Sequence, residues 1–357
     1  MSNPRISLAL AAPGALPEAG RILVLGPRAE TDLSDLPRAR LVLVQGFAPD
    51  HARLTAQGYT VVPTLGDEGD FAAAIVFLPR AKAEGRALVA TAAARCRPGA
   101  PIWIDGAKTD GVDSILKDLR ARAETIGAVG EPISKAHGKI FQVAPATGAV
   151  LADWQAQPFE PAPGFVTLPG VFSAEGVDRG SALLAAALPA TLPARVADLG
   201  AGWGWLSAQI LARSGVEHLD LVEADHTALD CARRNITDPR AAFHWADATG
   251  WLPEARYGAV VMNPPFHVAR VAEPQLGAAF IRAAGAMLSL SGTLYMVANR
   301  HLPYEPVLRQ HFHEVEELGR DPGFKLFRAA KPIVGAGKVA PVASAKPQRR
   351  RAPRVGR

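Results

Sequence analysis

Residues 196–204 read Val-Ala-Asp-Leu-Gly-Ala-Gly-Trp-Gly, a short apolar run that ends in three closely spaced glycines. The apolar run predicts a buried strand. The glycines predict a tight turn that leads into a helix and lets a ligand approach the backbone. A dinucleotide-binding turn has the spacing G-x-G-x-x-G, whereas Trp205 stands here at the position of its third glycine. Asp198, inside the strand, suits an ammonium group better than a phosphate. The stretch therefore predicts an α/β fold with a ligand at this turn, the alternative being a glycine turn with only a packing role.

The residues after this turn alternate between short apolar runs and helical stretches, which predicts β-α-β units and a parallel sheet. Strands are expected at 196–199, 219–223, 242–245, 259–262 and 293–298, and helices at 205–214, 227–235 and 276–288. The pattern changes near the end, where Asp321-Pro322-Gly323 is a strong turn signal between apolar runs at 315–318 and 325–328. An antiparallel hairpin is therefore expected to end the sheet.

The first half of the chain repeats this order with weaker signals. Strands are expected at 22–25, 41–44, 60–62, 74–78 and 102–104, helices at 82–95 and 112–123, and a terminal hairpin at 128–133 and 140–143. We interpret residues 22–30 as the counterpart of 196–204, and residues 75–80 as the counterpart of 260–266, as in a duplicated unit. We therefore predict two Rossmann-like α/β domains in tandem, each a mostly parallel sheet that ends in an antiparallel hairpin.

Length, composition and charge set the outer limits of this organisation. The 357 residues are enough for about two domains, and a hydrophobic share of 48% excludes a mostly disordered chain. The net charge is +5, yet residues 338–357 alone hold seven basic residues and no acidic one. Such a tail can bind phosphates nonspecifically or be a solvated extension, and both interpretations stay open. We predict a first domain at 1–154, a linker rich in Pro and Gly at 155–169, a second domain at 170–334 and a basic, disordered tail at 335–357.

The cysteines and the absence of long apolar runs indicate the compartment. Cys96 and Cys231 lie far apart and form no C-x-x-C pair, which argues against a disulfide framework and against a zinc site. No apolar run approaches the roughly 20 residues of a transmembrane helix. We therefore expect a cytoplasmic protein with no metal and no membrane partner, and we make no prediction of its oligomeric state.

The glycine turn resembles the S-adenosylmethionine (SAM) loop of class I methyltransferases. This resemblance implies that SAM is the cofactor and that both domains have the class I methyltransferase fold. The loop residues that it places at the cofactor are Asp198, Gly200, Ala201, Gly202 and Gly204.

Acidic residues follow the next two strands, where the same family places its other cofactor contacts. Glu223, at the end of the second strand and followed by Ala224, can accept both ribose hydroxyls, although Asp225 competes for this role. In the family an acid after the third strand receives the adenine amino group. Asp247, followed by Ala248, stands at that position, and it could equally cap a helix.

Residues 263–266, Asn-Pro-Pro-Phe, follow the fourth strand and resemble the motif of SAM-dependent methyltransferases that act on planar amino groups. Such an amine is a poor nucleophile because its lone pair is delocalised, and two acceptors aimed at its hydrogens free the lone pair. The side-chain oxygen of Asn263 and the carbonyl of Pro264 can supply these acceptors, while Pro264 and Pro265 fix the backbone. Phe266 offers a flat face on which a base can stack. These four residues are predicted to be catalytic, and Asn263 is also expected at the cofactor.

A further segment narrows the resemblance. Residues 170–173, Gly-Val-Phe-Ser, and 177–184, Val-Asp-Arg-Gly-Ser-Ala-Leu-Leu, are similar to the segment before the SAM loop in bacterial ribosomal RNA guanine-N2 methyltransferases, which also share Asn-Pro-Pro-Phe-His. The resemblance implies methylation of the N2 amine of a guanine in 16S rRNA, with ribosomal RNA or a ribosomal subunit as partner. The substrate-binding residues that it suggests are Asp178, Arg179, Gly180, Ser181 and His267.

The same family has two methyltransferase-like halves, of which the first has lost SAM binding and helps to hold the RNA. The first half of this chain fits a lost site. Pro27 and Arg28 replace the second glycine and its neighbour, and residues 78–80, Leu-Pro-Arg, replace Asn-Pro-Pro. These stretches are not expected to bind SAM or to polarise an amine.

Four alternatives remain at this point. The same chemistry on 23S rRNA is the nearest. A methyltransferase of protein glutamine or DNA is disfavoured because those enzymes usually carry Tyr where Phe266 stands. A non-catalytic RNA-binding assembly factor would not need the paired acceptors at Asn263 and Pro264. A nicotinamide-dependent oxidoreductase is disfavoured by the missing third glycine.

Overall fold

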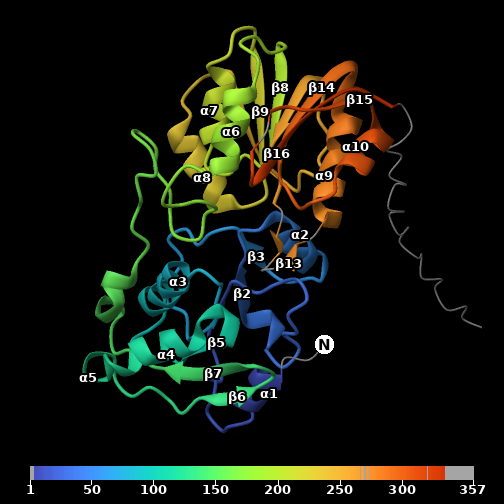
Figure 1. Ribbon diagram of the computed structural model, residues 1–357. Coiled ribbons are helices and arrows are strands. Elements are labelled where there is room, and N and C mark those ends of the chain that lie inside the picture. The colour runs from blue at the N-terminus through green and yellow to red at the C-terminus, as the bar shows by residue number, and fades with distance from the viewer. Residues whose placement is uncertain (1–3, 266, 269–270, 273, 320, 334–357) are drawn as a thin grey trace, which may run out of the picture.

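The strands of the chain form two seven-stranded sheets, one in each half. The computed structural model describes residues 4–265, 267–268, 271–272, 274–319 and 321–333. Within these residues the sheets have the orders β3-β2-β1-β4-β5-β7-β6 and β10-β9-β8-β11-β14-β16-β15. Counted from the first strand of each sheet, the two orders are the same. The two sheets lie in separate bodies, one above the other in Figure 1.

The first sheet is parallel except at its end. Its strands are β1 (Ile22–Leu25), β2 (Leu41–Val44), β3 (Val61–Val62), β4 (Ala73–Phe77), β5 (Ile102–Ala107), β6 (Ile133–Lys135) and β7 (Gly138–Val143). β7 pairs antiparallel with both β5 and β6, and every other pair is parallel. The predicted terminal hairpin is therefore present, and it closes the sheet next to β5.

The second sheet repeats this arrangement with longer strands. Its members are β8 (Arg195–Leu199), β9 (His218–Glu223), β10 (Ala241–Trp245), β11 (Tyr257–Met262), β14 (Leu288–Asn299), β15 (Phe312–Glu317) and β16 (Phe324–Pro332). β16 pairs antiparallel with β14 and β15 across the predicted turn. A separate two-stranded hairpin joins β12 (His267–Val268) and β13 (Val271–Ala272). As in the first sheet, the carboxyl ends of the parallel strands meet at one edge, where ligands bind in open α/β sheets.

Helices cover both faces of each sheet. In the first half these are α1 (Pro4–Leu10), α2 (Ala48–Ala56), α3 (Lys82–Arg95), α4 (Val112–Arg120) and α5 (Ala123–Ile126), with 3₁₀ turns at Arg38–Arg40, Lys108–Asp110 and Gly148–Trp154. The second half has α6 (Arg179–Ala187), α7 (Trp205–Leu211), α8 (His226–Asn235), α9 (Pro274–Met287) and α10 (Glu305–His311). In Figure 1, α6, α7 and α8 lie on one side of the second sheet and α9 and α10 on the other.

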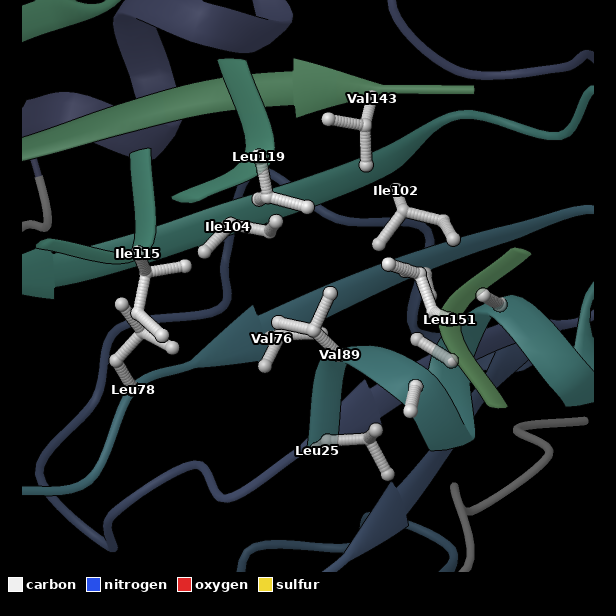
Figure 2. Packing of buried hydrophobic residues seen from close by; sticks show 14 of the residues in the cluster. Leu25, Val76, Leu78, Val89, Ile102, Ile104, Ile115, Leu119, Val143 and Leu151 are labelled. Carbon is white, nitrogen blue, oxygen red and sulfur yellow. The ribbon is translucent and has the colours of Figure 1, made fainter. Parts of the chain in front are cut away.

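Strand alternation divides each half into two cores, because successive side chains of a strand point to opposite faces. In β11, Ala259 and Val261 belong to the core under α6 and α7, while Val260 and Met262 belong to the core under α9 and α10. The first half follows the same rule. Figure 2 shows Val76, Ile102 and Ile104 of its sheet packed against the helix residues Val89, Ile115 and Leu119.

Two sequence predictions in the first half were wrong in detail. The first strand of the terminal hairpin was expected at 128–133, but β6 spans Ile133–Lys135. Gly127 has a φ of +85°, and Pro132 precedes the ladder, so regular pairing begins only where Ile133 meets Ile140. The helix expected at 112–123 ends at Arg120 and is followed by the separate short helix α5.

Between the two halves the chain has little regular structure. Residues 155–178 contain one isolated antiparallel bridge, Phe159 to Thr167, and no helix or longer strand. Throughout the described ranges, no helix has the length and apolar character needed to cross a bilayer.

Candidate functional site

The glycine turn after β8 has the backbone that the sequence predicted. Gly200, Gly202 and Gly204 have φ values of +76°, +56° and +88°, a region that favours glycine. A Cβ placed on Gly204 would lie 3.1 Å from Ile236, so this glycine also allows α7 to start close to α8. A Cβ on Gly202 would meet no atom within 4 Å. The turn therefore leaves open space at Gly202, where a ligand can approach the main chain.

Below this turn lies a buried carboxylate with one unsatisfied oxygen. Asp198 is fully buried, and its Oδ2 accepts a hydrogen bond from the Ser207 hydroxyl at 2.6 Å. Its Oδ1 has no hydrogen-bond partner among the residues that the structure describes. Burial raises the pKa of Asp198 to about 7; the Ser207 hydrogen bond opposes this shift and the charge of Glu223 adds to it. A cationic or N–H-donating ligand group would satisfy the free oxygen, which agrees with the expectation that Asp198 faces an ammonium group.

Glu223, at the end of β9, is held by two main-chain donors. The amide of Gly202 donates to its Oε2 and the amide of Asp225 to its Oε1, both at 2.8 Å. Burial is the main cause that raises the pKa of this carboxyl. Asp225 is used differently: its side chain caps α8 by accepting from the amides of Thr227 and Ala228. The structure thus favours Glu223 over Asp225 as the carboxylate that faces a ligand.

Among the described residues, those after β10 have no contact that indicates a ligand. Asp247 is exposed, and its Oδ1 accepts from both the amide and the hydroxyl of Thr249, at 2.8 and 2.6 Å. Asp247 therefore closes a turn, and no helix starts between it and β11, so the interpretation of Asp247 as a helix cap was wrong. Its Oδ2 forms no hydrogen bond with any described residue. Ala248 is buried in the core under α9. The cofactor role of these two residues stays a prediction.

The side-chain amide of Asn263 is oriented by hydrogen bonds from its nitrogen to two residues at the start of α6, which the sequence did not reveal. Its Nδ2 donates to Asp178 Oδ2 and to the Ser181 hydroxyl, both at 2.8 Å. A carboxylate can only accept hydrogen bonds, so the nitrogen of the amide must face Asp178. Its oxygen, Oδ1, consequently points away from α6. The following Pro264 is buried and Pro265 is exposed.

The segment predicted to bind substrate contacts Asn263 and the turn between β15 and β16, and its substrate-binding role stays a prediction. Asp178 caps α6 by accepting from the Ser181 amide at 2.7 Å. Arg179 forms an ion pair with Asp321 at 2.6 Å, in the turn between β15 and β16. A Cβ on Gly180 would lie 3.0 Å from both Asp178 and the Phe324 ring, so a side chain there would disturb the cap. The signal that could have shown this is the Asp at a helix start, three residues before Ser181.

Two predicted residues cannot be placed fully. Phe266 lies outside the described residues. His267 begins β12, and its side chain is not described. The other predicted residues meet at one edge of the second sheet, because β8, β9, β10 and β11 all end there. This convergence is what the motif spacing predicted.

The matching edge of the first sheet is built differently. No helix follows β1 within residues 26–37, and residues 78–80 follow β4 without an amide side chain. A cavity of about 1380 Å³ opens at this edge, and it is lined by both halves, including Arg28, Glu84 and Asp225. Burial, together with the charge of Asp225, raises the pKa of Glu84 to about 7. The first half thus keeps a hollow at the equivalent place without the glycine turn or the asparagine.

Neither a cluster of metal-ligating side chains nor a disulfide is found in the described part of the chain. No group of three or more His, Cys, Asp or Glu side chains there could hold a metal ion. Cys96 and Cys231 are free thiols, and burial raises the pKa of Cys96 to about 12.

Both halves of the chain match known protein families. The family description "Methyltransferase small domain" matches residues 163–328, and "Methyltransferase small domain N-terminal" matches residues 19–131. Ribosomal RNA small subunit methyltransferase C of Pseudomonas paraeruginosa is 32% identical over 85% of this chain and 95% of its own length. The protein of the same name from Pseudomonas aeruginosa is 31% identical over 87% and 94%.

A solved structure shows the same fold along almost the whole chain. It is a T. thermophilus 16S rRNA N2 methyltransferase in complex with AdoMet and guanosine, with a TM-score of 0.74, 24% identity and coverage of 92% of both chains. Given the sequence identity to curated relatives along nearly their full length, this chain belongs to the ribosomal RNA small subunit methyltransferase C family.

Proposed function

We propose that this protein transfers a methyl group from SAM to the exocyclic N2 amine of a guanine in 16S rRNA. The observation that carries the proposal is Asn263, whose amide nitrogen donates to Asp178 and Ser181, so that its oxygen is turned away from them. Asn263 directly follows Met262, which pairs with Leu199 at the start of the glycine turn. The names of the relatives support the RNA target, and the guanosine in the T. thermophilus complex supports the base. We also infer that the protein works in the cytoplasm, where ribosomal subunits are assembled.

The cofactor site fits SAM by the chemistry of its donors and acceptors. SAM would approach the main chain in the open space at Gly202. Its cationic group would face the buried Oδ1 of Asp198. Its ribose would face the carboxylate of Glu223, which the Gly202 amide helps to orient. Asp247 and Ala248 would border the adenine. When bound, SAM supplies a methyl group on a sulfonium, which is already a good leaving group.

The residues of the chain therefore have to align and polarise the amine rather than perform strong acid–base chemistry. Asn263 Oδ1 and the Pro264 carbonyl accept the two hydrogens of the amine and localise its lone pair. Pro264 and Pro265 hold this turn rigid. Phe266 and His267 border the base in this proposal, Phe266 by stacking on it.

The first half serves the reaction without binding SAM in this proposal. We infer class I methyltransferase domains at 1–154 and 170–334, with the linker at 155–169 and the basic tail at 335–357. The equal strand orders of the two sheets support the duplication. The missing helix after β1 and the absence of an asparagine after β4 support the loss of the first site.

Asp198→Asn is expected to change cofactor affinity and stability in opposite directions. The variant keeps an oxygen for the ligand but removes the charge, so the Kd for SAM should rise about tenfold at pH 8. The raised pKa of Asp198 means that ionisation of this buried group opposes folding as the pH rises from about 4 to 7, so the ligand-free variant should have a higher Tm at pH 8. Calorimetric titration and thermal melts measure the two effects.

The pH dependence provides the control for this prediction. The carboxylate of the wild type becomes protonated as the pH falls through about 7, so its affinity for SAM should fall in that range. The Asp198→Asn variant should lose this dependence. Equal affinity of both proteins at pH 8 would show that Asp198 does not face the cofactor.

The proposed function is tested with ribosomal subunits from a strain that lacks this gene. The purified protein is incubated with labelled SAM and each subunit, and labelled nucleosides are mapped by mass spectrometry. N2-methylguanosine in small-subunit RNA is the expected result. Label in large-subunit RNA would overturn the 16S assignment, and label only in protein or DNA would overturn the RNA substrate altogether.

A further inference from the structure

The loop after β2 in the first half and the loop after β9 in the second half are joined through their main chains. Phe47 and Asp225 form an isolated antiparallel bridge. The amide of Ala48 donates to the carbonyl of Ala224 at 2.8 Å, and the amide of His226 donates to the carbonyl of Gly46 at 2.9 Å. We call residues 46–48 and 224–226, together with Trp245, the inter-half brace. Ala48 begins α2 and His226 begins α8. Figure 1 shows α2 on the side of the first half that faces the second.

Trp245, the last residue of β10, closes the brace. Its indole Nε1 lies 2.9 Å from the Gly46 carbonyl and 2.9 Å from the Ala224 carbonyl, so one N–H is shared between the two halves. The rings of His51 and His226 lie edge-on to the indole, with centroid distances of 4.9 and 5.3 Å. The indole is thus held by one histidine from each half.

Hydrogen bonds continue from the brace in both directions. In the first half, buried Gln45 accepts from the Phe47 amide at 2.8 Å and donates to the Pro27 carbonyl at 2.7 Å. In the second half, the Asp225 amide donates to Glu223, whose other oxygen accepts from Gly202. Hydrogen bonds and short stretches of main chain therefore connect Pro27, in the loop after β1, with Gly202 in the glycine turn of the second half.

We propose that the first half positions the cofactor-binding carboxylate through this brace, and that Trp245 and residues 46–48 are positioning residues for SAM. A carboxylate that accepts both ribose hydroxyls must keep both oxygens in a fixed plane. One of the two donors that orient Glu223 is the amide of Asp225, which is itself part of the brace. The proposal rests on SAM as the cofactor of the proposed function, and it does not depend on which RNA nucleotide is methylated.

Ala48→Pro tests the main-chain part of the brace. Ala48 is the first residue of α2, where proline is compatible with a helix, and Phe47 before it is already extended with φ −86° and ψ 111°. The variant loses the N–H that donates to Ala224, and the proline ring takes its place, so the two loops must separate. We expect the Kd for SAM to rise at least tenfold, while kcat at saturating SAM and the KM for RNA stay within about twofold.

Lys82→Pro is the matched control for this variant. Lys82 is the first residue of α3, its N-cap Ala81 is extended with φ −73° and ψ 110°, and its ammonium forms an ion pair with Asp118 inside the first half. This substitution places a proline at the same helical position at a residue that does not belong to the brace. Its Kd for SAM should remain within about twofold of the wild type.

Trp245→Phe tests the shared N–H with a smaller change. The variant keeps an aromatic ring between the histidines but removes the donor, and the Kd for SAM should rise about fivefold. Trp251→Phe is its control, because Trp251 packs on His244 and Tyr257 within the second half. Trp251→Phe should bind SAM like the wild type even if its Tm falls.

The outcomes separate positioning from simple stabilisation. A lower Tm for Ala48→Pro and Trp245→Phe with unchanged affinity for SAM at 25 °C would overturn the proposal, since the brace would then only stabilise the fold. A raised Kd for SAM in both variants and in neither control would support it. Binding of SAM by the wild type without methylation of rRNA would refute the substrate assignment and leave the brace intact.

Discussion

Asn263→Ala is expected to lower kcat/KM for methylation of rRNA by about 1000-fold, the size of effect seen when a preorganised polar contact to the reacting group is removed. The wild-type amide is held by Asp178 and Ser181, so its oxygen needs no reorganisation when the amine arrives. Alanine removes this acceptor and leaves only the carbonyl of Pro264. The measurement is a single-turnover assay with labelled SAM and the small subunit.

SAM binding should largely survive this substitution, although the sequence also places Asn263 at the cofactor. The glycine turn, Asp198 and Glu223 all remain, so we expect the Kd for SAM to rise no more than about fivefold. Methylation by Asn263→Ala at the wild-type rate would exclude Asn263 as the acceptor for the amine. Loss of SAM binding together with activity would instead place Asn263 chiefly at the cofactor.

Asp178→Ala is expected to lower kcat about 100-fold, although in this proposal Asp178 does not contact the substrate. The substitution removes the acceptor that fixes the Asn263 amide, which can then rotate and present its NH2 group to the substrate amine. A misplacement of about 1 Å in a reacting group can cost on the order of 100-fold in rate. The variant also loses the cap of α6, which should cost about 1 kcal/mol of stability. Single-turnover rates and thermal melts of the same preparation separate the two effects.

Asp178→Asn is the control that distinguishes orientation from folding. A single oxygen, Oδ2, accepts from both the Ser181 amide and Asn263, and asparagine can place its own oxygen there. Most of the activity should therefore return. Ser181→Ala removes only the second acceptor of the Asn263 amide and should cost about fivefold. If Asp178→Asn were as inactive as Asp178→Ala, the charge of Asp178 rather than its hydrogen bond would be required.

Much of the architecture was predictable because it depends on local patterns. Short apolar runs, the glycine turn and the Asp-Pro-Gly turn each indicate their element without reference to the rest of the chain, and the structure places strands at all five positions expected between residues 196 and 298. The convergence of Asp198, Glu223 and Asn263 was also predictable, since parallel strands bring their carboxyl ends to one edge. The prediction of a hairpin strand at 128–133 was wrong because Gly127 and Pro132 delay regular strand pairing until Ile133.

The contacts that orient the site were not predictable from spacing. Asp178 and Asn263 are 85 residues apart, and Trp245 and Gly46 are 199 residues apart. Asp178 was expected to bind substrate, whereas the structure places it behind Asn263. Trp245 stood at the end of an expected strand, where a tryptophan suggests only core packing. Such roles depend on contacts between segments that lie far apart in the sequence, which no local pattern records.

The equal strand orders of the two halves have a consequence for how the chain reaches its native state. Two sets of strands with the same order offer one another plausible but wrong partners, as in misassembled tandem domains. Synthesis from the N-terminus reduces this risk, because the last strand of the first sheet ends at Val143 and β8 begins only at Arg195. The first sheet can close while the second is still being translated. Its surface around residues 46–48 is then already formed when the loop that carries Glu223 emerges from the ribosome. The folded first half can therefore guide the folding of the second.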